Sequence, residues 1–556
     1  MTTLEKDKRR WLRNRLMTAL AGAALCTTSY AQIQGLAAKA PPSAIAIAQP
    51  GTQGPTQAEM DKADTDPNQW LTSNKGYLGY RYSKLTQINT QNVRNLKVVC
   101  SFKLGEQGSF QSGLLVYNGV LYATSVFGTF AIDAASCQKR WSYQYTPGAK
   151  MGQQNNKGAA ISNGRVIRGT PDGHLIALDA ATGKLLWDRM IMDASGGEYA
   201  TAVPLVWKDM IFIGKAGGEL GIRGEMMAFR AGDGTKIWGF HTIPGPGERG
   251  SDTWKNPASM AHGGGPTWTS YSLDPIAGLL LMPVGNAGPD FANEARPGAN
   301  LFTNSIVALD AMTGQLKWWH QLLGPDDRDL DTTIVAAFDT ADGSHLAAAA
   351  GKDGVLHVVE RATGKLLFTT SLVSQYTNRA TAIPTDANVR LCPVAATQWN
   401  GPAYSPDTNL IYMNGIDWCA KAIKGPTPQY VRGKTYLGWA TPSGYAERDP
   451  IEQAFGLVNA IDPTNGRLLW PSPPVAGLTA TAGGLLLTAD TQGDLFALDA
   501  KTGALLHKLQ LGAGAMDGGL VSYEAKGRQF IAVGAGDNNP TYKVKGDNAI
   551  VILGLP

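Results

Sequence analysis

Residues 176–187 read Ile-Ala-Leu-Asp-Ala-Ala-Thr-Gly-Lys-Leu-Leu-Trp, and this stretch carries the main evidence for the fold. Apolar residues flank Asp179 and a Thr-Gly turn, which predicts a β-hairpin whose second strand ends in Trp187. Six more copies of the pattern occur, at residues 130–141, 227–238, 307–318, 357–368, 459–470 and 496–507. A hairpin repeated seven times predicts one all-β repeat fold, with the Trp residues packed between neighbouring units.

The distance between copies matches the size of a propeller blade. The aspartates of the first two copies are 46 residues apart, as expected for a four-stranded blade. Two longer gaps contain the Gly- and Pro-rich residues 244–266 and an irregular stretch at about residues 417–453. The end strands, residues 93–104 and 548–556, would pair to form an eighth blade and leave no open sheet edge. We therefore predict an all-β, eight-bladed β-propeller closed by its N- and C-terminal strands.

The composition agrees with this fold and argues against a nucleic-acid-binding role. The 556 residues include 66 Gly and 31 Pro, and 17% are charged, which is typical of a turn-rich all-β chain. The net charge of +4 comes from the first fifteen residues, where six Lys and Arg side chains oppose Glu5 and Asp7. The remainder is nearly neutral and has no basic stripe that would bind phosphates.

The N-terminus has the pattern of a secretory signal. A basic start precedes the apolar residues 16–25, and a small-x-small cleavage site ends at Ala31, so we predict a signal peptide over residues 1–31. An uncleaved anchor is the alternative, although the apolar run is short for a bilayer span. Residues 32–66 are rich in Ala, Pro, Gln and Thr and predict a disordered tether before the propeller, residues 67–556. The expected location is the periplasm.

Export permits disulfide bonds, and four cysteines follow the signal. They are Cys100, Cys137, Cys392 and Cys419. Cys392 and Cys419 flank a hairpin-like stretch and form the favoured pair, with two free buried thiols as the alternative. The sequence contains no Cys-x-x-Cys-His motif, which predicts that no c-type haem is attached. Electrons released in a redox reaction would therefore pass to a separate protein.

The repeats resemble those of the pyrroloquinoline quinone (PQQ)-dependent alcohol dehydrogenases. Two further segments carry the resemblance, RYSKLTQINTQNVRNL at residues 81–96 and GGGPTWTSYSLDP at residues 263–275. It extends from about Trp70 to the C-terminus. The resemblance implies a quinoprotein alcohol dehydrogenase-like propeller whose cofactors are PQQ and either Ca²⁺ or a lanthanide ion.

Three motifs match the metal site of that family. In GKAGGELGIRG, residues 214–224, Glu219 matches a metal ligand, and Gly217 and Gly218 let the backbone approach the flat cofactor. In MPVGNAGPDF, Asn286 matches a second ligand through its amide oxygen, a hard donor suited to Ca²⁺ or a lanthanide. A solvated loop Glu and an ordinary turn Asn are the alternative interpretations.

The third motif is the acidic segment at residues 326–331. By resemblance, Asp329 is the catalytic base and a metal ligand, and Asp331 is the extra carboxylate typical of lanthanide-using relatives. Residues two apart in an extended segment point the same way, so both carboxylates can face one cation. Carboxylates this close repel each other unless a cation lies between them. The choice between Ca²⁺ and a lanthanide stays open, as does a solvated acidic loop.

The resemblance also marks positions around the cofactor. Trp268 matches the aromatic residue on whose face the quinone lies, because stacking favours a planar ring system. Lys352 matches the cation that reaches the quinone oxygens. Thr201 matches a hydroxyl that binds a cofactor carboxylate, and Trp399 lies where the family contacts the cofactor's edge.

Several positions depart from the family pattern. Gln111 stands where a cofactor-binding Glu is usual, and Lys157 replaces an Arg, which keeps the charge but loses the planar fork. The adjacent-cysteine ring found over the cofactor in many members is absent. Val475 stands in place of a bulky rim Trp, so we expect a wider mouth and a preference for larger or aromatic alcohols over methanol.

The resemblance implies a periplasmic dehydrogenase that oxidises an alcohol to an aldehyde or ketone. Asp329 would accept the alcohol proton while hydride moves to the quinone. A separate soluble cytochrome c would accept the electrons, and a homodimer stays open. Two alternatives remain: a quinone-free hydrolase similar to tetrathionate hydrolase, with Asp329 as general acid or base, and a non-catalytic scaffold similar to the propeller lipoprotein of outer-membrane assembly.

Overall fold

The computed structural model describes most of the chain after residue 53. The described residues are 54–106, 108–149, 151–377, 389–397, 399, 401–438, 447–472, 477–511, 518–536 and 546–556. They all belong to one unit of the chain, Ala48–Pro556. The predicted signal peptide and most of the predicted tether lie outside them. Within the described ranges, the helices are too short or too polar to cross a membrane.

The described residues form eight sheets of four or five strands. In chain order, the first four sheets are β3–β6 (Leu115–Tyr117, Val120–Thr124, Gly128–Asp133, Lys139–Gln144), β7–β10 (Ala160–Ser162, Arg165–Gly169, His174–Asp179, Leu185–Met190), β11–β14 (Leu205–Trp207, Met210–Gly214, Glu225–Arg230, Lys236–His241) and β15–β18 (Ser272–Asp274, Leu279–Val284, Ser305–Asp310, Leu316–Gln321). Within each sheet, consecutive strands pair antiparallel, as in a meander.

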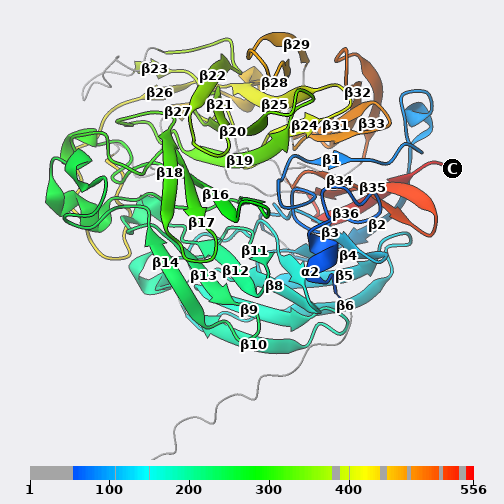
Figure 1. The fold of residues 1–556 in the computed structure, drawn as a ribbon, viewed down its shortest axis with the longest axis horizontal. Helices are drawn as coiled ribbons and strands as arrows, with labels where there is room; N and C mark the ends of the chain where they lie inside the picture. Colours follow the sequence, from blue (N-terminus) through cyan, green and yellow to red (C-terminus); the bar gives the residue numbers. More distant parts are fainter. Residues whose placement is uncertain are drawn as a thin grey trace, which may run out of the picture. The chain divides into compact units, whose positions relative to one another are not determined.

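The second half of the chain continues this arrangement. Its sheets are β19–β22 (Thr332–Asp339, His345–Gly351, Val355–Glu360, Leu366–Ser371), β24, β25, β28 and β29 (Ala403–Ser405, Leu410–Asp417, Phe455–Ile461, Leu468–Ser472), β30–β33 (Thr479–Thr481, Leu485–Ala489, Asp494–Asp499, Leu505–Gln510) with β1 (Tyr82–Ser83), and β34–β36 (Leu520–Ala525, Arg528–Ala535, Ala549–Gly554) with β2 (Lys97–Lys103). Figure 1 shows neighbouring sheets side by side in chain order.

The core is built mainly by the second strand of each sheet. The strands β4, β12 and β16, for example, are buried at every position.

Few helices are present among the described residues. They are α2 (Gln57–Met60) and the short 3-10 helices η1 (Val93–Asn95), η2 (Ala194–Gly196), η3 (Gly218–Leu220), η4 (Ser251–Thr253), η5 (Pro257–His262), η6 (Asn293–Ala295) and η7 (Ile451–Gln453). The arrangement of four-stranded sheets confirms the all-β, propeller-like fold class predicted from the repeats.

The repeated sequence forms β-hairpins, as predicted, and these hairpins are the third and fourth strands of seven sheets. In the second sheet, Oδ1 of Asp179 accepts hydrogen bonds from the backbone N–H groups of Ala181 and Thr182 and from the Thr182 hydroxyl. Gly183 then turns the chain with φ +73°, a conformation that favours glycine. These local bonds explain why the Asp-x-x-Thr-Gly pattern could be recognised without knowledge of the tertiary structure.

Six of the seven repeats dock onto the next one through the aromatic residue at their end, a Trp in five of them and Phe368 in the other. A Cβ added at Gly183 would lie 2.6 Å from Trp141, so the indole of the first sheet packs directly on the turn of the second. The indole N–H of Trp141 also donates to the Ala180 carbonyl at 3.0 Å. The same packing joins Trp187 to Gly234, Trp238 to Gly314, Trp318 to Gly364, Phe368 to Gly466, and Trp470 to Gly503. The predicted packing role of the repeated aromatic residues is therefore confirmed.

The two ends of the described chain meet in one sheet. Strand β2 pairs antiparallel with β36, as expected for the terminal strands. Cys100 on β2 occupies the slot of the repeat Trp and forms a disulfide with Cys137, which occupies the turn-glycine slot of the first repeat. This covalent link takes the place of a Trp-on-Gly contact and was not predicted. The predicted pair, Cys392 and Cys419, is confirmed.

Removing the first disulfide is expected to destabilise the folded chain. The bond closes a loop of 37 residues in the unfolded chain, so replacing Cys100 and Cys137 by Ala should lower the free energy of unfolding by about 2–4 kcal/mol. Chemical denaturation of the double variant measures the effect. Activity of the still-folded variant should match that of the wild type, and an unchanged denaturation midpoint would contradict the prediction.

Two predicted boundaries differ from the structure. Helix α2 begins at Thr56 with a capping box to Glu59 and buries Met60, so ordered structure begins before the expected boundary at residue 67. The Ala- and Gln-rich composition concealed this short helix. The stretch expected to be irregular, about residues 417–453, contributes β26 (Ala420–Ala422) and β27 (Glu447–Arg448), which form a small sheet with β23 (Val389–Leu391).

Candidate active site

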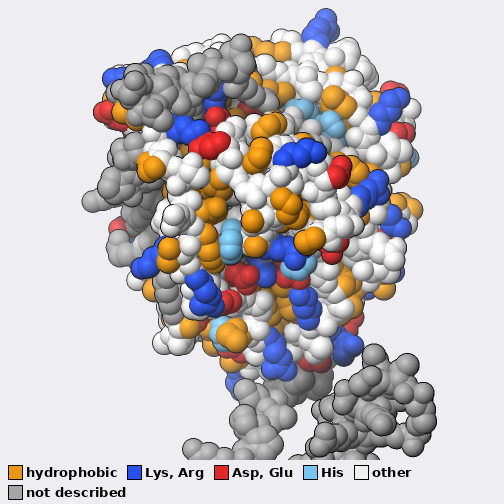
Figure 2. Space-filling view, turned by 90° about the vertical axis from the view of Figure 1, so that its left-hand side faces the viewer, with side chains coloured by type: hydrophobic (Ala, Val, Ile, Leu, Met, Phe, Trp, Pro, Cys, Tyr) orange, Lys and Arg blue, Asp and Glu red, His pale blue; other side chains and the backbone are white. Residues whose placement is uncertain are grey.

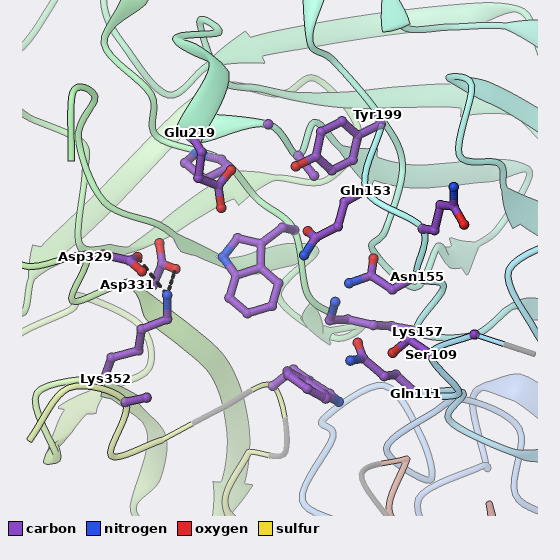
Figure 3. Close-up of a pocket in the computed structure, with 18 of the residues that line it drawn as sticks. Ser109, Gln111, Gln153, Asn155, Lys157, Tyr199, Glu219, Asp329, Asp331 and Lys352 are labelled. Carbon is purple, nitrogen blue, oxygen red and sulfur yellow. Dashed lines mark hydrogen bonds and ion pairs between the residues drawn. The ribbon is translucent and has the colours of Figure 1, made fainter. Parts of the chain in front are cut away.

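A cavity of about 330 Å³ is lined mainly by residues that lie just before the first strands of successive sheets. Five such residues come from five different sheets: Gln111, Lys157, Trp268, Asp331 and Trp399. Figure 3 shows that acidic side chains and Lys352 occupy one side, and that Gln111, Asn155 and Lys157 occupy the other. The meander therefore brings sequence-distant polar residues to one site.

Two carboxylates share one ammonium group at the acidic side. Nζ of Lys352 lies 2.7 Å from Oδ1 of Asp329 and 2.7 Å from Oδ2 of Asp331 (Figure 3). The three side chains are 12%, 7% and 6% exposed, so water screens these charges only weakly. The two aspartates lie side by side at one cation, as predicted. In this structure the cation is the Lys352 ammonium group.

A turn around Asp326 presents Asp329 to the cavity. The Asp326 carboxylate accepts hydrogen bonds from the backbone N–H groups of Arg328 and Leu330, each at 2.8 Å. Asp329 lies between Arg328 and Leu330 and has φ +56°. The backbone therefore leaves the extended conformation at this residue. The backbone N–H of Lys352 donates to the Asp331 carbonyl at 2.9 Å and joins the turn to strand β20.

Glu219 reaches the same cavity from another sheet. It lies in η3, directly after strand β12, between Gly217 at φ +117° and Gly221 at φ +67°. A Cβ at Gly217 would lie 2.0 Å from the Gly197 carbonyl oxygen, so only glycine fits here. The backbone N–H of Tyr436 donates to the Glu219 carbonyl at 2.8 Å and fixes this turn.

Asn286 is adjacent to the carboxylate pair but does not line the cavity. Its backbone N–H donates to Oδ1 of Asp331 at 2.8 Å, and its side-chain amide donates to the Ala287 carbonyl at 3.3 Å. The amide side chain is buried. The backbone of Asn286 thus holds Asp331 in place, while its side-chain amide bonds to the neighbouring backbone.

Burial makes the ionised form of these carboxylates unfavourable unless a cation lies beside them. Burial, reinforced by the charge of Asp331, raises the pKa of Glu219. Burial also raises the pKa of Asp329 to about 7, although Lys352 opposes the shift. A multivalent cation would relieve both effects, because it stabilises the ionised form of each carboxylate.

The donor atoms fit a hard metal ion. Glu219, Asn286, Asp329 and Asp331 supply oxygens, the ligand type that Ca²⁺ and related ions prefer. Within the described ranges, no three His, Cys, Asp or Glu side chains already form a closed metal site. The Lys352 ammonium stands between two of the carboxylates where a cation would bind, so metal binding would require it to move.

Asp329 should make the stability of the metal-free protein depend on pH. Its pKa of about 7 in the folded chain exceeds the 3.8 of an unfolded aspartate, so between these values the folded state retains a proton that the unfolded state has lost. This stabilising contribution is complete below pH 3.8 and disappears as the pH rises through 7. Thermal denaturation across this range should show a flatter slope for Asp329→Asn than for the wild type, and equal slopes would contradict the prediction.

The other side of the cavity combines aromatic and cationic groups. The Trp268 and Trp399 rings lie 6.3 Å apart at 67°, and Nζ of Lys157 lies 4.7 Å and 5.0 Å from their centroids. Nζ of Lys352 lies 5.7 Å from the Trp268 centroid. A planar anion would find an aromatic face and two ammonium groups here.

Three buried polar atoms of lining residues lack a hydrogen-bond partner within the part of the chain that the structure describes. They are Oε1 of Gln111, Oδ1 of Asn155 and Nε1 of Trp399. Buried polar atoms are costly unless they are paired, so their concentration at one cavity indicates a polar ligand. The set offers both a donor and acceptors, which fits a ligand with several carboxylate and carbonyl groups such as PQQ.

Thr201 and Gly218 do not line this cavity, unlike Gly217. The buried Thr201 hydroxyl donates to the Trp268 carbonyl at 2.9 Å, and the Thr201 carbonyl accepts from the Lys157 backbone at 3.1 Å. Thr201 thus bonds to the backbone of two cavity residues, Trp268 and Lys157, and its predicted contact with a cofactor carboxylate stays a prediction. A sequence motif can locate this residue but cannot show where its hydroxyl points.

The sequence did not identify several residues at the cavity. Gln153, Asn155, Tyr199 and Arg448 line it, and none belongs to a motif that distinguishes it from an ordinary loop residue. Val394 and Ala395 also line it, close to the Cys392–Cys419 disulfide. The rim position Val475 lies outside the described residues.

Surface charge gives no sign of a nucleic-acid site on the face seen in Figure 2. Lys and Arg side chains are interspersed there with Asp and Glu over the described part of that face. Ion pairs in the described ranges include Lys424–Glu294 and Arg432–Asp193. This distribution agrees with the neutral composition of the chain after its first fifteen residues.

Comparison with known proteins agrees with the fold. The family model for the glucose/ethanol/alcohol dehydrogenase β-propeller domain, named for PQQ, matches residues 70–375. A second model, for the outer membrane protein assembly factor BamB, matches residues 454–549.

Similar sequences and structures cover most of the chain. The lanthanide-dependent methanol dehydrogenase of Methylacidiphilum fumariolicum is 29% identical over 86% of this chain and 86% of its own length. The quinohemoprotein alcohol dehydrogenase ADH-IIG of Pseudomonas putida is 30% identical, over 86% of this chain and 74% of its own length. A solved europium-containing methanol dehydrogenase superposes with a TM-score of 0.79 at 26% identity, covering 90% of this chain and all of that one. The chain therefore belongs to the family of PQQ-dependent, quinoprotein alcohol dehydrogenases.

Proposed function

We propose that the chain is a PQQ- and metal-dependent dehydrogenase that oxidises an alcohol to an aldehyde or ketone. The observation that carries the proposal is the buried pair Asp329 and Asp331 on one ammonium group, beside the aromatic face of Trp268 in a single cavity. A non-catalytic scaffold would not need two buried carboxylates and an ammonium group gathered beside an aromatic face in one cavity. Membership of the family supplies the reaction class.

The residues divide into two sets with different tasks. Glu219, Asn286, Asp329 and Asp331 would hold Ca²⁺ or a lanthanide ion, with both kinds of ion compatible with four oxygen donors. Trp268 would support the plane of PQQ, with Gly217 allowing close backbone approach. Lys157, Lys352, Gln111 and Trp399 would bind its polar edge, since their charges and unpaired atoms face this cavity.

When bound, PQQ and the metal ion supply a two-electron acceptor and Lewis acidity, which side chains alone cannot provide. Asp329 accepts the proton of the alcohol hydroxyl at Oδ1 or Oδ2. Burial raises the pKa of Asp329 to about 7 in the metal-free chain, and Lys352 at 2.7 Å together with a bound ion would keep the carboxylate ionised, the form that accepts a proton. Burial of the carboxylates excludes bulk water from the proton transfer.

The eight sheets would be the blades of one propeller, closed by pairing of β2 with β36 and by the Cys100–Cys137 disulfide. A closed ring would leave the cavity at its centre, where loops from all sides converge. A signal peptide over residues 1–31 and a tether after it would place the enzyme in the periplasm. A soluble cytochrome c would accept its electrons, because the sequence has no c-type haem motif.

The preferred substrate would be a larger or aromatic alcohol, and this part of the proposal rests on Val475 in the sequence. Comparing kcat/KM for methanol, a long-chain alcohol and a benzylic alcohol tests it. Methanol turnover as efficient as that of the larger alcohols would refute this preference and leave the reaction class intact.

The reaction class is tested with the purified mature chain loaded with PQQ and either Ca²⁺ or La³⁺. Bound quinone is detected by near-ultraviolet absorption, and activity by reduction of an artificial electron-accepting dye with alcohol. Retained quinone and alcohol-dependent dye reduction support the proposal. No bound quinone and no dye reduction with either ion would refute it and favour a quinone-free activity at the same cavity.

A further inference from the structure

Arg448 is a lining residue of the cavity that the roles assigned above leave unused. It is half-buried and lies on β27, in the small sheet formed by β23, β26 and β27, which we call the inserted sheet. Val394 and Ala395, shortly after β23, also line the cavity. Part of the cavity wall therefore comes from the inserted sheet, and Arg448 is the charged one of these three lining residues.

The inserted sheet holds the Arg448 guanidinium over an aromatic ring. Its central carbon lies 5.1 Å from the centroid of the Trp418 ring, and Trp418 is 4% exposed. The Trp418 indole N–H donates to the Asp449 carbonyl at 2.7 Å, and the Asp449 backbone N–H donates to the Cys419 carbonyl at 2.9 Å. A guanidinium uses its face to stack on an aromatic ring and its N–H edge to bind a carboxylate. Stacking on Trp418 is therefore compatible with binding an anion.

Backbone hydrogen bonds join the inserted sheet to the acidic side of the cavity. The backbone N–H of Val394 donates to the Trp418 carbonyl at 3.0 Å, and that of Ala396 donates to the Lys352 carbonyl at 2.9 Å. Nζ of Lys352 in turn lies 2.7 Å from the carboxylate of Asp329. The wall formed by the inserted sheet is thus attached directly to the residue that contacts the proposed general base.

The groups assigned to the polar edge of PQQ come from other sheets. Figure 3 shows Gln111 and Lys157 across the cavity from Asp329 and Lys352. Gln111 and Lys157 precede the first strands of the sheets β3–β6 and β7–β10, whereas Arg448 comes from the inserted sheet. The wall that contains Arg448 is therefore attached on the side where the alcohol would lose its proton.

We propose that Arg448 binds an anionic group of the substrate, so that the preferred substrates are alcohols that carry a carboxylate. The inference rests on the proposed function of the cavity as an alcohol dehydrogenase site. A guanidinium and a carboxylate form paired, charge-assisted hydrogen bonds, which are stronger than bonds between neutral groups. Stacking on Trp418 restricts the Arg448 side chain before the substrate arrives, which lowers the entropic cost of binding.

The proposal is tested with two alcohols that differ only in the group opposite the reacting hydroxymethyl group. They are para-(hydroxymethyl)benzoate and para-methylbenzyl alcohol, and dye reduction by the PQQ- and metal-loaded chain gives kcat/KM for each. The wild type should have the higher kcat/KM for the benzoate. Arg448→Gln should lower that value by about ten- to a hundredfold and change the value for the neutral alcohol by less than about twofold. Arg448→Lys should recover part of the loss, since it keeps the charge without the planar fork.

A binding measurement provides a readout that does not need turnover. para-Methylbenzoate has the carboxylate but no hydroxyl to oxidise, so calorimetric titration of the loaded chain measures its Kd. This Kd should rise by about ten- to a hundredfold in Arg448→Gln. Arg390→Gln is the matched control, because Arg390 belongs to β23 of the same inserted sheet but is 54% exposed, pairs with Asp449 at 2.7 Å and does not line the cavity. This variant should bind para-methylbenzoate as the wild type does.

Four results would overturn the role of Arg448. Equal losses for both alcohols would show that the substitution disturbs the inserted sheet as a whole. Loss of bound PQQ, seen by near-ultraviolet absorption, would show that Arg448 binds the cofactor. A wild type that prefers the neutral alcohol would exclude a carboxylate-bearing substrate, and an unchanged Kd for para-methylbenzoate in Arg448→Gln would exclude the contact.

Failure of the proposed function gives a different result. A loaded wild type that reduces no dye with any alcohol tested would refute the dehydrogenase itself. The Kd of para-methylbenzoate for the wild type, Arg448→Gln and Arg390→Gln would still decide whether Arg448 binds a carboxylate.

Discussion

Asp329→Asn is expected to lower kcat for alcohol oxidation by about 10²- to 10⁴-fold, the range that loss of a general base produces. Asp329 lines the cavity beside Trp268 and Lys352, where an alcohol bound against the cofactor would meet it. An amide keeps an oxygen that can bind a metal ion but cannot accept the hydroxyl proton. Steady-state dye reduction by the PQQ- and metal-loaded variant measures the loss.

Asp327→Asn is the matched control for this substitution. Asp327 lies in the same acidic turn, but its carboxylate pairs with Arg328 at 3.4 Å and it is not a lining residue of the cavity. This variant should retain the wild-type kcat. Metal and PQQ content of Asp329→Asn must be measured alongside, because retained cofactors with lost turnover identify the proton-accepting role. A kcat for Asp329→Asn within about twofold of the wild type would contradict it.

Features set by local rules could be predicted from the sequence. The hairpin turn depends on hydrogen bonds from Asp179 to residues two and three positions later, so the pattern itself contains the interaction. The proximity of Asp329 and Asp331 was also predicted, but the expected reason, the alternation of an extended chain, was wrong, because Asp329 has φ +56° in a turn around Asp326. The Cys392–Cys419 pair was also local, since its partners flank one short stretch.

Contacts between loops that are distant in the sequence could not be predicted in this way. Cys100 was recognised in a Trp slot, but its partner Cys137 follows only from the last sheet meeting the first. Thr201 stands in the expected motif, yet its hydroxyl binds the Trp268 carbonyl because two loops cross there. Each of these facts belongs to the tertiary structure alone.

Lys352→Met is expected to destabilise the metal-free protein by about 3–5 kcal/mol, the usual effect of removing one partner from a buried ion pair. The ammonium of Lys352 is the counterion that the structure provides for Asp329 and Asp331, each at 2.7 Å. Without it, two buried carboxylates face each other unpaired. Thermal denaturation of the variant after removal of metal with a chelator should show a clearly lower melting temperature than the wild type.

Added La³⁺ or Ca²⁺ should restore the stability of Lys352→Met, because an ion that binds the folded state stabilises it by mass action. Lys215→Met provides the matched control. Lys215 is also 12% exposed and also bridges two carboxylates, Glu198 at 2.8 Å and Glu225 at 3.1 Å, neither of which is a proposed metal ligand. Both variants should lose stability, and only Lys352→Met should recover it with metal. Glu225 also pairs with Lys236 at 2.6 Å, so Lys215→Met should lose less stability than Lys352→Met. Equal recovery of the two variants with metal, or none in Lys352→Met, would show that the carboxylate pair does not bind the ion.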